Sequence, residues 1–253
     1  MIKISIIGSG NVAQHLVKII SKTQNLDLVQ LIVRHSDAVV HLVSSDKICI
    51  DLSKIKDADL YIIAVSDIAI EEVSAKLPFK NKFVVHTSGS ANLNLLSDQN
   101  YRGVFYPLQT FSKNKYVDFK TIPICLETER DADYNVLLQI ANAITDIVYK
   151  VDSNQRKALH VAAVFACNFV NHLYKIANDI CTENQIPFQI LYSLIKETAN
   201  KIETLSPIDA QTGPAERADL ATINAHIKFL SNENQQDIYK ILTKSIIDNG
   251  KKL

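Results

Sequence analysis

The chain has 253 residues, of which 47% are hydrophobic, so it can bury either one large core or two of ordinary size. Lysine plus arginine and aspartate plus glutamate number 27 each, so no broad positive field exists for binding nucleic acid, and we expect no nucleic-acid partner. Its four scattered cysteines match neither a disulfide framework nor a zinc site, and no apolar run is long enough for a membrane span, so we expect a soluble cytoplasmic protein with reduced thiols, no metal and no membrane partner.

Short β-rich segments alternate with helical patterns in the first part of the chain, from Ile2 to about Val151. This alternation predicts a parallel sheet with helices on its faces, and the consecutive apolar residues are typical of strands that are covered on both sides. Residues 1–151 are therefore expected to form an α/β Rossmann-type domain. The expected strands are Lys3–Ile7, Leu28–Val33, Leu60–Val65, Phe83–His86, Val104–Tyr106, Ile122–Leu126 and Ile147–Val151.

From residue 152 onward apolar residues recur at three- and four-residue spacing, which predicts an all-α C-terminal domain over residues 152–253 that serves substrate binding and dimerisation. Apolar residues surround nearly the whole circumference of its first helix. That helix is expected to be buried on most sides, by its own domain or by a partner subunit. The expected helices are 154–185, 188–204, 215–230 and 234–249.

The first strand leads directly into a glycine-rich turn and then into a helical pattern, the context that a dinucleotide-binding fingerprint requires. Gly8 permits the tight turn, Gly10 lets a pyrophosphate approach the backbone, and Ala13 keeps the helix close to the sheet. A plain strand–turn–helix connection is the alternative, which position and context disfavour. The predicted cofactor-binding residues here are Gly8, Ser9, Gly10, Asn11, Val12 and Ala13.

The second strand is expected to end beside the adenosine ribose of the dinucleotide, and Arg34, His35 and Ser36 lie there. A guanidinium and a hydroxyl suit a 2′-phosphate better than two free ribose hydroxyls. The sequence therefore predicts NADP rather than NAD. In the alternative, Arg34 is a solvated surface side chain and Asp37 supplies the acid of an NAD site.

Two further turns follow predicted strands and are expected to face the cofactor, because ligands of open α/β sheets bind beyond the carboxyl ends of the strands. The first contains Val65, Ser66 and Asp67, although Asp67 could instead cap a helix without touching a ligand. In the second, small hydroxyl residues surround a glycine, which lets backbone amides reach a ligand. Its predicted cofactor-binding residues are Thr87, Ser88 and Gly89.

Four segments beyond the glycine-rich turn carry a resemblance to a known family: residues 86–89, 106–111, 159–173 and 212–219. With them, the chain resembles the Rossmann-like oxidoreductases whose C-terminal half is the domain of unknown function 2520, relatives of pyrroline-5-carboxylate reductase and the β-hydroxyacid dehydrogenases. Many members carry His where this chain has Tyr106, and Gly where it has Ala218. The β-hydroxyacid dehydrogenases pair a catalytic Lys with an Asn four residues later. If Asn168 matches that Asn, Val164 stands at the Lys position.

Along the first helix of the C-terminal part, His160, Val164, Asn168 and His172 recur every four residues, and three of these four are polar. This spacing predicts one polar stripe on an apolar helix, and the stripe is expected to face a ligand, water or polar neighbours. We hypothesise that His160 is the acid/base, that Asn168 orients a substrate carbonyl or imine, and that His172 contacts the substrate. In the alternative, the histidines are structural and the asparagines tie helices together.

Two loops contain further candidate substrate residues. Gln109 and Thr110 follow a strand end and a proline, so they could line the substrate pocket or make buried turn contacts. Arg217 lies where residues 212–219 are expected to begin a helix, with Pro214 at an early position. Its guanidinium could hold a substrate carboxylate, within one subunit or across a dimer, or pair with Asp219 or Glu216.

Together these features predict an NADP-dependent oxidoreductase that transfers hydride to or from a small carbonyl, imine or hydroxy-acid substrate between its two domains. The apolar first helix predicts a homodimer through the helical domain. A non-catalytic NADP-binding sensor or regulatory protein is the alternative, because the usual proton-donating Lys is missing and a fold does not guarantee an activity.

Overall fold

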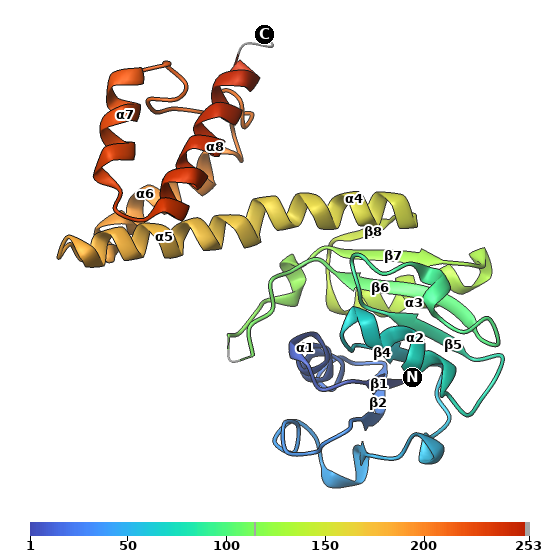
Figure 1. Ribbon diagram of the computed structural model, residues 1–253. Coiled ribbons are helices and arrows are strands. Elements are labelled where there is room, and N and C mark those ends of the chain that lie inside the picture. Colours follow the sequence, from blue (N-terminus) through green and yellow to red (C-terminus); the bar gives the residue numbers. More distant parts are fainter. Residues whose placement is uncertain (114, 251–253) are drawn as a thin grey trace. The chain divides into compact units, whose positions relative to one another are not determined.

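The computed structural model describes residues 1–113 and 115–250, and the chain divides into two compact units, Met1–Cys167 and Asn168–Leu253. The first unit contains the sheet and the helices that cover it, and the second is helical (Figure 1). The predicted fold class is therefore confirmed: an α/β Rossmann-type sheet followed by an all-α region. Within the described ranges, no helix is long and apolar enough to cross a membrane.

The sheet has eight strands within the described part of the chain, in the order β3-β2-β1-β4-β5-β6-β7-β8. Strands β1 to β6 pair in parallel with their neighbours, so the carboxyl ends of β1, β4, β5 and β6 share one edge. The strands are β1 (Ile2–Ile7), β2 (Leu26–Ile32), β3 (Ile48–Cys49), β4 (Leu60–Ile63), β5 (Phe83–His86), β6 (Tyr101–Pro107), β7 (Ile124–Thr128) and β8 (Val148–Lys150).

Two features of this sheet correct the sequence-based expectation. Strand β3 was not predicted, because two residues are too short to show a periodic pattern. Strand β7 runs antiparallel to β6, so the sheet is not wholly parallel. The described residues between these strands form a short 3₁₀ turn, Phe119–Thr121, and no α-helix, whereas a parallel return usually runs through an α-helix.

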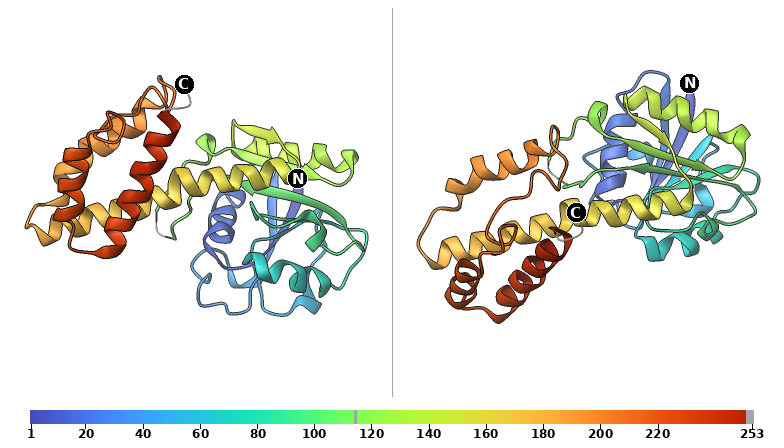
Figure 2. Two further views of the ribbon diagram at one scale, coloured as in Figure 1. Left: turned by 45° about the horizontal axis from the view of Figure 1, so that its top comes forward. Right: turned by 90° about the horizontal axis from the view of Figure 1, so that it is seen from above.

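Helices and connecting segments cover both faces of the sheet (Figure 1; Figure 2), and apolar residues pack on each face. On one face, Ile4 and Ile6 pack with side chains of α1 (Asn11–Ile20) and α3 (Asp131–Ile144). On the other face, Ile63 packs with α2 (Ile70–Ala75) and with the segments that connect the strands. Burial on both faces explains why these strands are apolar at consecutive positions.

The last helix of the first unit, α4 (Ser153–Ala163), begins with a complete capping box. The Asp152 carboxylate accepts from the Gln155 backbone N–H, and the Gln155 side chain accepts from the Asp152 N–H. A π-helical segment, Val164–Phe169, follows, so the predicted helix 154–185 is interrupted in its regular geometry. Val161 is 52% exposed, so its own domain does not bury this helix on most sides; burial by a partner subunit stays a prediction.

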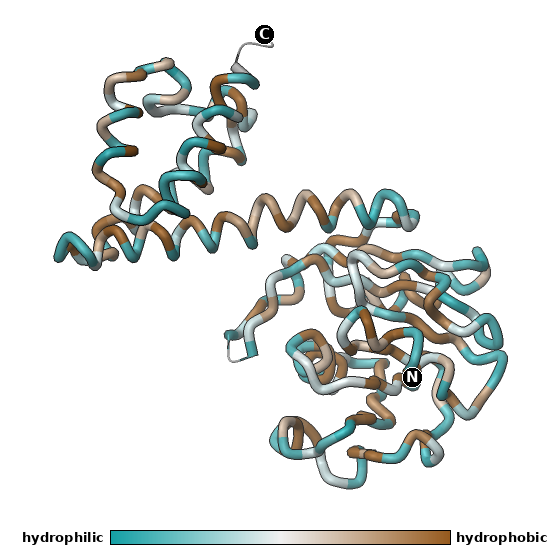
Figure 3. Tube along the Cα trace, in the orientation of Figure 1, coloured by the Kyte–Doolittle hydropathy of each residue, from teal (hydrophilic) through white to brown (hydrophobic). Residues whose placement is uncertain are grey.

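The second unit contains α5 (Val170–Glu183), α6 (Tyr192–Lys201), α7 (Leu220–Phe229) and α8 (Glu233–Gly250). Hydrophobic and hydrophilic residues alternate along these helices (Figure 3). The predicted helix start at residue 215 is wrong, because α7 begins only at Leu220, where the Asp219 carboxylate caps it through Thr222. The residues before it turn instead: Gly213 and Ala218 both have positive φ, 108° and 50°, which an α-helix does not accept.

Candidate functional site

The glycine-rich turn lies between β1 and α1, at the carboxyl edge of the parallel strands. Gly8 has a φ of +135°, and a Cβ there would lie 2.2 Å from the backbone oxygen of Ala64, so only glycine fits. Gly10 is different: it caps α1 in extended backbone geometry, and a Cβ there would meet nothing within 4 Å. The open space beside Gly10 is where the fingerprint places a pyrophosphate.

The first turn of α1 suits an anion. It contains no acidic residue, and Gly10 offers no side-chain cap for the N–H groups. These donors and the positive end of the helix dipole attract negative charge. Gln14 supports the turn from behind, since its side-chain amide donates to the Ser9 backbone oxygen at 2.9 Å.

The loop after β6 is attached to the same end of α1. The Asn11 side chain donates to the Phe111 backbone oxygen at 2.9 Å, and His15 Nε2 lies 3.0 Å from the Ser112 oxygen. The His15 and Phe111 rings also lie 4.9 Å apart. Asn11, predicted to touch cofactor, thus uses its side chain to position the loop that carries Gln109 and Thr110.

The residues after β2 form an exposed cationic corner. Arg34 and His35 are exposed, and Ser36 is half-buried at the start of a turn, where its carbonyl accepts from the Val39 N–H at 2.8 Å. The charge of Arg34 contributes to a lowered pKa of Glu72, after the larger effect of Lys76. The guanidinium is therefore accessible to a ligand from solvent.

The turns after β4 and β5 are joined by a hydrogen bond. The Ser90 hydroxyl donates to the Asp67 carboxylate at 2.5 Å. Asp67 begins the 3₁₀ turn Asp67–Ala69, which Ser66 precedes as N-cap, so Asp67 does not cap a helix. Val65 is half-buried and Ser66 is exposed, so the turn borders solvent at the edge where the glycine-rich turn also lies.

The loop Thr87–Ala91 is closely held by its own hydrogen bonds. The Ser88 hydroxyl accepts from the N–H groups of Ser90 and Ala91 at 3.1 and 2.9 Å. His86 Nδ1 accepts from the Ser88 N–H at 3.1 Å, while burial, with the charge of Arg156, lowers the pKa of His86 to about 4. His86 is therefore a neutral structural histidine at neutral pH.

Arg156 holds this loop from α4 and was missed by the sequence analysis. Its guanidinium, 1% exposed, donates to the backbone oxygens of Ser88, Gly89 and Ala91 at 3.1, 3.2 and 2.7 Å. Two further N–H groups donate to Glu127 Oε2 at 3.1 and 2.9 Å. The sequence does show an acid, Glu127, after an apolar strand, and an arginine one helical turn before His160. Spacing in sequence alone does not show that these two side chains form an ion pair.

A second pair links β6 with α4. The Tyr106 hydroxyl lies 3.2 Å from His160 Nδ1, and burial raises the pKa of Tyr106 to about 12. A Cβ on Gly89 would lie 2.6 Å from His160 Nδ1 and 2.7 Å from the hydroxyl. The structure thus brings Gly89, Tyr106 and His160 together.

The other predicted substrate residues are exposed. The Gln109 side chain accepts from the Thr110 N–H at 2.7 Å, a local turn contact. Asn168, His172 and Arg217 belong to the second unit, and the charge of Arg217 contributes to a lowered pKa of Asp219, after the capping bonds from Thr222. A π-helical segment, Val164–Phe169, replaces regular α-helical geometry between His160 and His172, and the expected stripe assumed a regular α-helix there.

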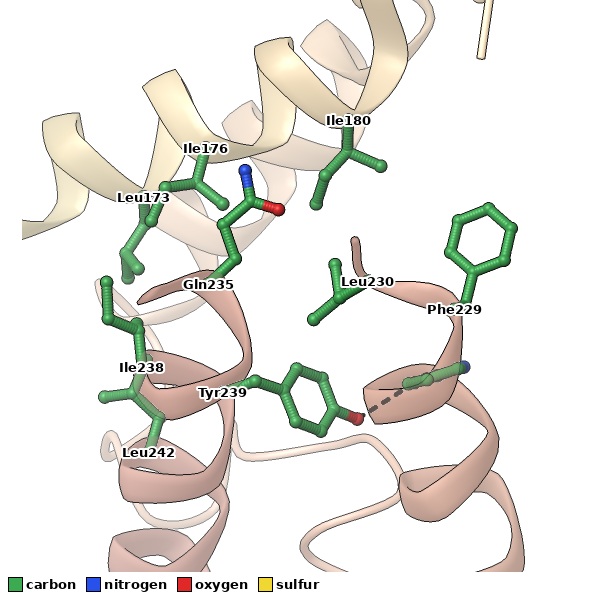
Figure 4. A pocket seen from close by; sticks show the side chains of 10 residues that line it. Leu173, Ile176, Ile180, Phe229, Leu230, Gln235, Ile238, Tyr239 and Leu242 are labelled. Atoms are coloured by element: carbon green, nitrogen blue, oxygen red, sulfur yellow. Dashed lines mark hydrogen bonds between the residues drawn. The ribbon is translucent and has the colours of Figure 1, made fainter. Parts of the chain in front are cut away.

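The second unit has an apolar pocket of its own, about 290 Å³, between α5, α7 and α8 (Figure 4). Leu173, Ile176 and Ile180 line it from α5, and the Gln235 amide points toward them. His226 Nδ1 lies 2.9 Å from the Tyr239 hydroxyl on its other side. Gln235 Oε1 is buried and has no hydrogen-bond partner in the described part of the chain.

No group of three or more His, Cys, Asp or Glu residues in ranges 1–113 and 115–250 is arranged to hold a metal ion. The candidate site consists of the glycine-rich turn, the cationic corner after β2, the two turns after β4 and β5, and the Tyr106–His160 pair.

Comparison with solved structures finds the same architecture elsewhere. A Bacteroides fragilis protein described as a “putative NADP oxidoreductase” is 37% identical, with 98% of each chain covered and a TM-score of 0.89. A Thermotoga maritima protein is 19% identical over 98% of each chain, with a TM-score of 0.72. A 1-pyrroline-5-carboxylate reductase from Streptococcus pyogenes is 16% identical, covering 100% of this chain and 99% of that one, with a TM-score of 0.64. The last two similarities concern the fold alone.

The family model described as a domain of unknown function (DUF2520) matches residues 122–246. Comparison with curated proteins gave no match. The resemblance inferred from the sequence motifs is confirmed by the family model and by the relative that is 37% identical along its whole length. The chain belongs to the family of Rossmann-like oxidoreductases whose C-terminal part is the domain of unknown function 2520.

Proposed function

We propose that this protein is an NADP-dependent oxidoreductase that transfers hydride to or from a small carbonyl, imine or hydroxy-acid compound. The observation that carries the proposal is the glycine-rich turn, where the space beside Gly10 adjoins the uncapped start of α1. The name of the Bacteroides fragilis relative, an NADP oxidoreductase, supports the same activity class.

The residues present fit this cofactor. Residues 8–13 would hold the pyrophosphate through backbone N–H groups, and Arg34, with His35 and Ser36, would hold the 2′-phosphate. The turns 65–67 and 87–89 would border the rest of the dinucleotide at the carboxyl edge of the sheet. When bound, NADP supplies or accepts the hydride, and the protein supplies orientation, a dry site and a proton.

His160 is the proposed acid/base, because it lies against Gly89 at this edge and an imidazole ring can both donate and accept a hydrogen bond to a reacting group. We further propose that Asn168 orients the carbonyl or imine. The remaining proposed substrate contacts are Gln109, Thr110, His172 and Arg217.

Purified protein with NADPH and a panel of ketoacids, aldehydes and cyclic imines tests the activity, with NADPH oxidation followed by absorbance. We expect turnover of at least one class, and loss of it in His160→Gln with NADPH affinity unchanged. A protein that binds NADPH and oxidises it with no compound on the panel would favour the non-catalytic sensor, the alternative raised by the absence of a Lys four residues before Asn168. A protein that binds no NADPH would contradict both.

We also propose that a second copy of the chain covers the helices of the second unit. Large apolar side chains are exposed there, including Ile190, Leu194, Phe229 and Ile241, at 67%, 62%, 66% and 68%. Such a concentration is unusual on a monomer. Sedimentation equilibrium should give twice the chain mass for the wild type and one chain mass for Ile241→Glu, whereas Ile50→Glu, exposed on the first unit, should stay dimeric. A monomeric wild type would contradict the proposal.

A further inference from the structure

The Tyr106–His160 pair lies against Gly89, and Arg156 holds the backbone of Gly89. Gly89 fills the space beneath both side chains, since a Cβ there would overlap His160 Nδ1 and the Tyr106 hydroxyl. The Gly89 backbone is itself held by Arg156, one helical turn before His160 on α4. One helix therefore supplies both the imidazole and the anchor of the loop beneath it.

The anchor is rigid because its charges are matched. Arg156 donates through Nε and Nη2 to Glu127, and Ser153 donates to the second oxygen of the same carboxylate at 2.5 Å. The Arg156 and Glu127 side chains are 1% and 13% exposed. A buried ion pair whose remaining donors and acceptors are bonded holds one geometry, and here that geometry includes the loop under His160.

The direction of the Tyr106–His160 hydrogen bond follows from burial. Tyr106 is 9% exposed, and burial keeps its phenol protonated by raising its pKa to about 12. If His160 Nδ1–H donated to the hydroxyl, the phenolic proton would need another acceptor, and the described structure gives that hydroxyl only Nδ1. A buried donor without an acceptor is unfavourable, so we infer that the phenol donates to Nδ1.

We propose that Tyr106 is a positioning residue for His160: its hydroxyl occupies Nδ1, places the ring proton on Nε2, and leaves Nε2–H as the donor to the substrate heteroatom. The inference rests on the proposed oxidoreductase function. It assigns a role to Tyr106, and it does not require His160 to be charged. A neutral imidazole held in one tautomer can hydrogen-bond a carbonyl or imine as hydride transfer proceeds.

Nitrogen NMR of the full chain with labelled histidine tests the tautomer directly. His160→Gln identifies the His160 resonances. The spectra are compared at alkaline pH, where an imidazole ring is neutral. We expect the wild type to hold the Nε2–H tautomer alone, and Tyr106→Phe to lose that single state and show both tautomers. Gly89→Ala keeps the hydroxyl but separates the pair, so it should produce the same mixture. The control Tyr149→Phe, at an exposed tyrosine of β8, should leave the spectrum unchanged.

A wild-type His160 protonated at Nδ1, or a Tyr106→Phe spectrum with the wild-type tautomer, would overturn the inference. Calorimetry with NADPH on the same samples separates this outcome from failure of the proposed function. If the protein does not bind NADPH, the proposed oxidoreductase function is wrong. The tautomer of His160 still shows whether Tyr106 positions the ring. With any compound that the wild type reduces, Tyr106→Phe should lower kcat about tenfold, the loss of one oriented hydrogen bond, while the NADPH dissociation constant stays within about twofold. Equal kcat values would contradict the inference.

Discussion

Gly8 and Gly10 stand two residues apart in the same turn, yet the structure predicts opposite consequences for replacing them with alanine. Gly8→Ala should unfold the protein more easily, because the φ of +135° is unfavourable for alanine and the new Cβ would lie 2.2 Å from a backbone oxygen. Gly10→Ala should fold normally, because Gly10 has an extended backbone and open space where the methyl group would lie.

The magnitudes follow from these two environments. At Gly8, backbone strain of about 1–3 kcal/mol adds to an overlap that costs about 1–3 kcal/mol, so the free energy of unfolding should fall by about 2–6 kcal/mol. At Gly10, lower backbone entropy in the unfolded chain and the poorer N-cap oppose each other, and the change should stay within about 1 kcal/mol. The Gly10→Ala methyl group would occupy the space for the pyrophosphate, so NADPH affinity should fall at least tenfold, about 1.4 kcal/mol.

Urea denaturation and calorimetric NADPH titration of the two variants and the wild type measure both quantities. We expect Gly8→Ala to be less stable than the wild type. We expect Gly10→Ala to keep the wild-type denaturation midpoint and to bind NADPH more weakly. A Gly10→Ala variant that binds NADPH as tightly as the wild type would refute the placement of the pyrophosphate. Wild-type stability in Gly8→Ala would refute the account of the turn.

Three further predictions concern charge. The pKa of His86 is lowered to about 4, mainly by burial, whereas the unfolded chain binds this proton near 6.5, so stability is complete above pH 6.5 and should fall by about 3 kcal/mol as pH drops toward 4. The urea denaturation midpoint should change less steeply with pH in His86→Gln than in the wild type. An equal dependence on pH would contradict the lowered pKa of His86. Arg156→Gln should lower the free energy of unfolding by about 3–5 kcal/mol by leaving Glu127 unpaired, and adding Glu127→Leu should recover part of that loss; strictly additive urea results would argue against the pair. Arg34→Ala should weaken NADPH binding about 10- to 100-fold and leave NADH binding unchanged, and calorimetry showing equal losses for both would exclude a 2′-phosphate role.

The sheet and the glycine-rich turn could be predicted because their signals are local. Buried strands are apolar at consecutive positions, and the fingerprint of residues 8–13 needs only a strand before it and a helix after it. Strand β3 and the antiparallel return of β7 left no such pattern. The start of α7 was misplaced because Pro214 fits a first helical turn, whereas the backbone of Gly213 and Ala218 excludes one.

The candidate site was predictable only where it follows strand ends. Residues after β1, β2, β4 and β5 could be placed because parallel strands share a carboxyl edge. Contacts between distant segments could not: Arg156 meets Glu127 across 29 residues, and Tyr106 meets His160 across 54. Spacing in sequence predicts neighbours along one helix or strand, and these pairs depend on how α4 packs against β6 and β7.

Calorimetric titration of the wild-type protein with NADPH shows whether the glycine-rich turn binds a dinucleotide. We expect one NADPH bound per chain, with tighter binding than NADH and with affinity that depends on Gly10 and Arg34. A titration in which neither NADPH nor NADH binds would contradict this expectation.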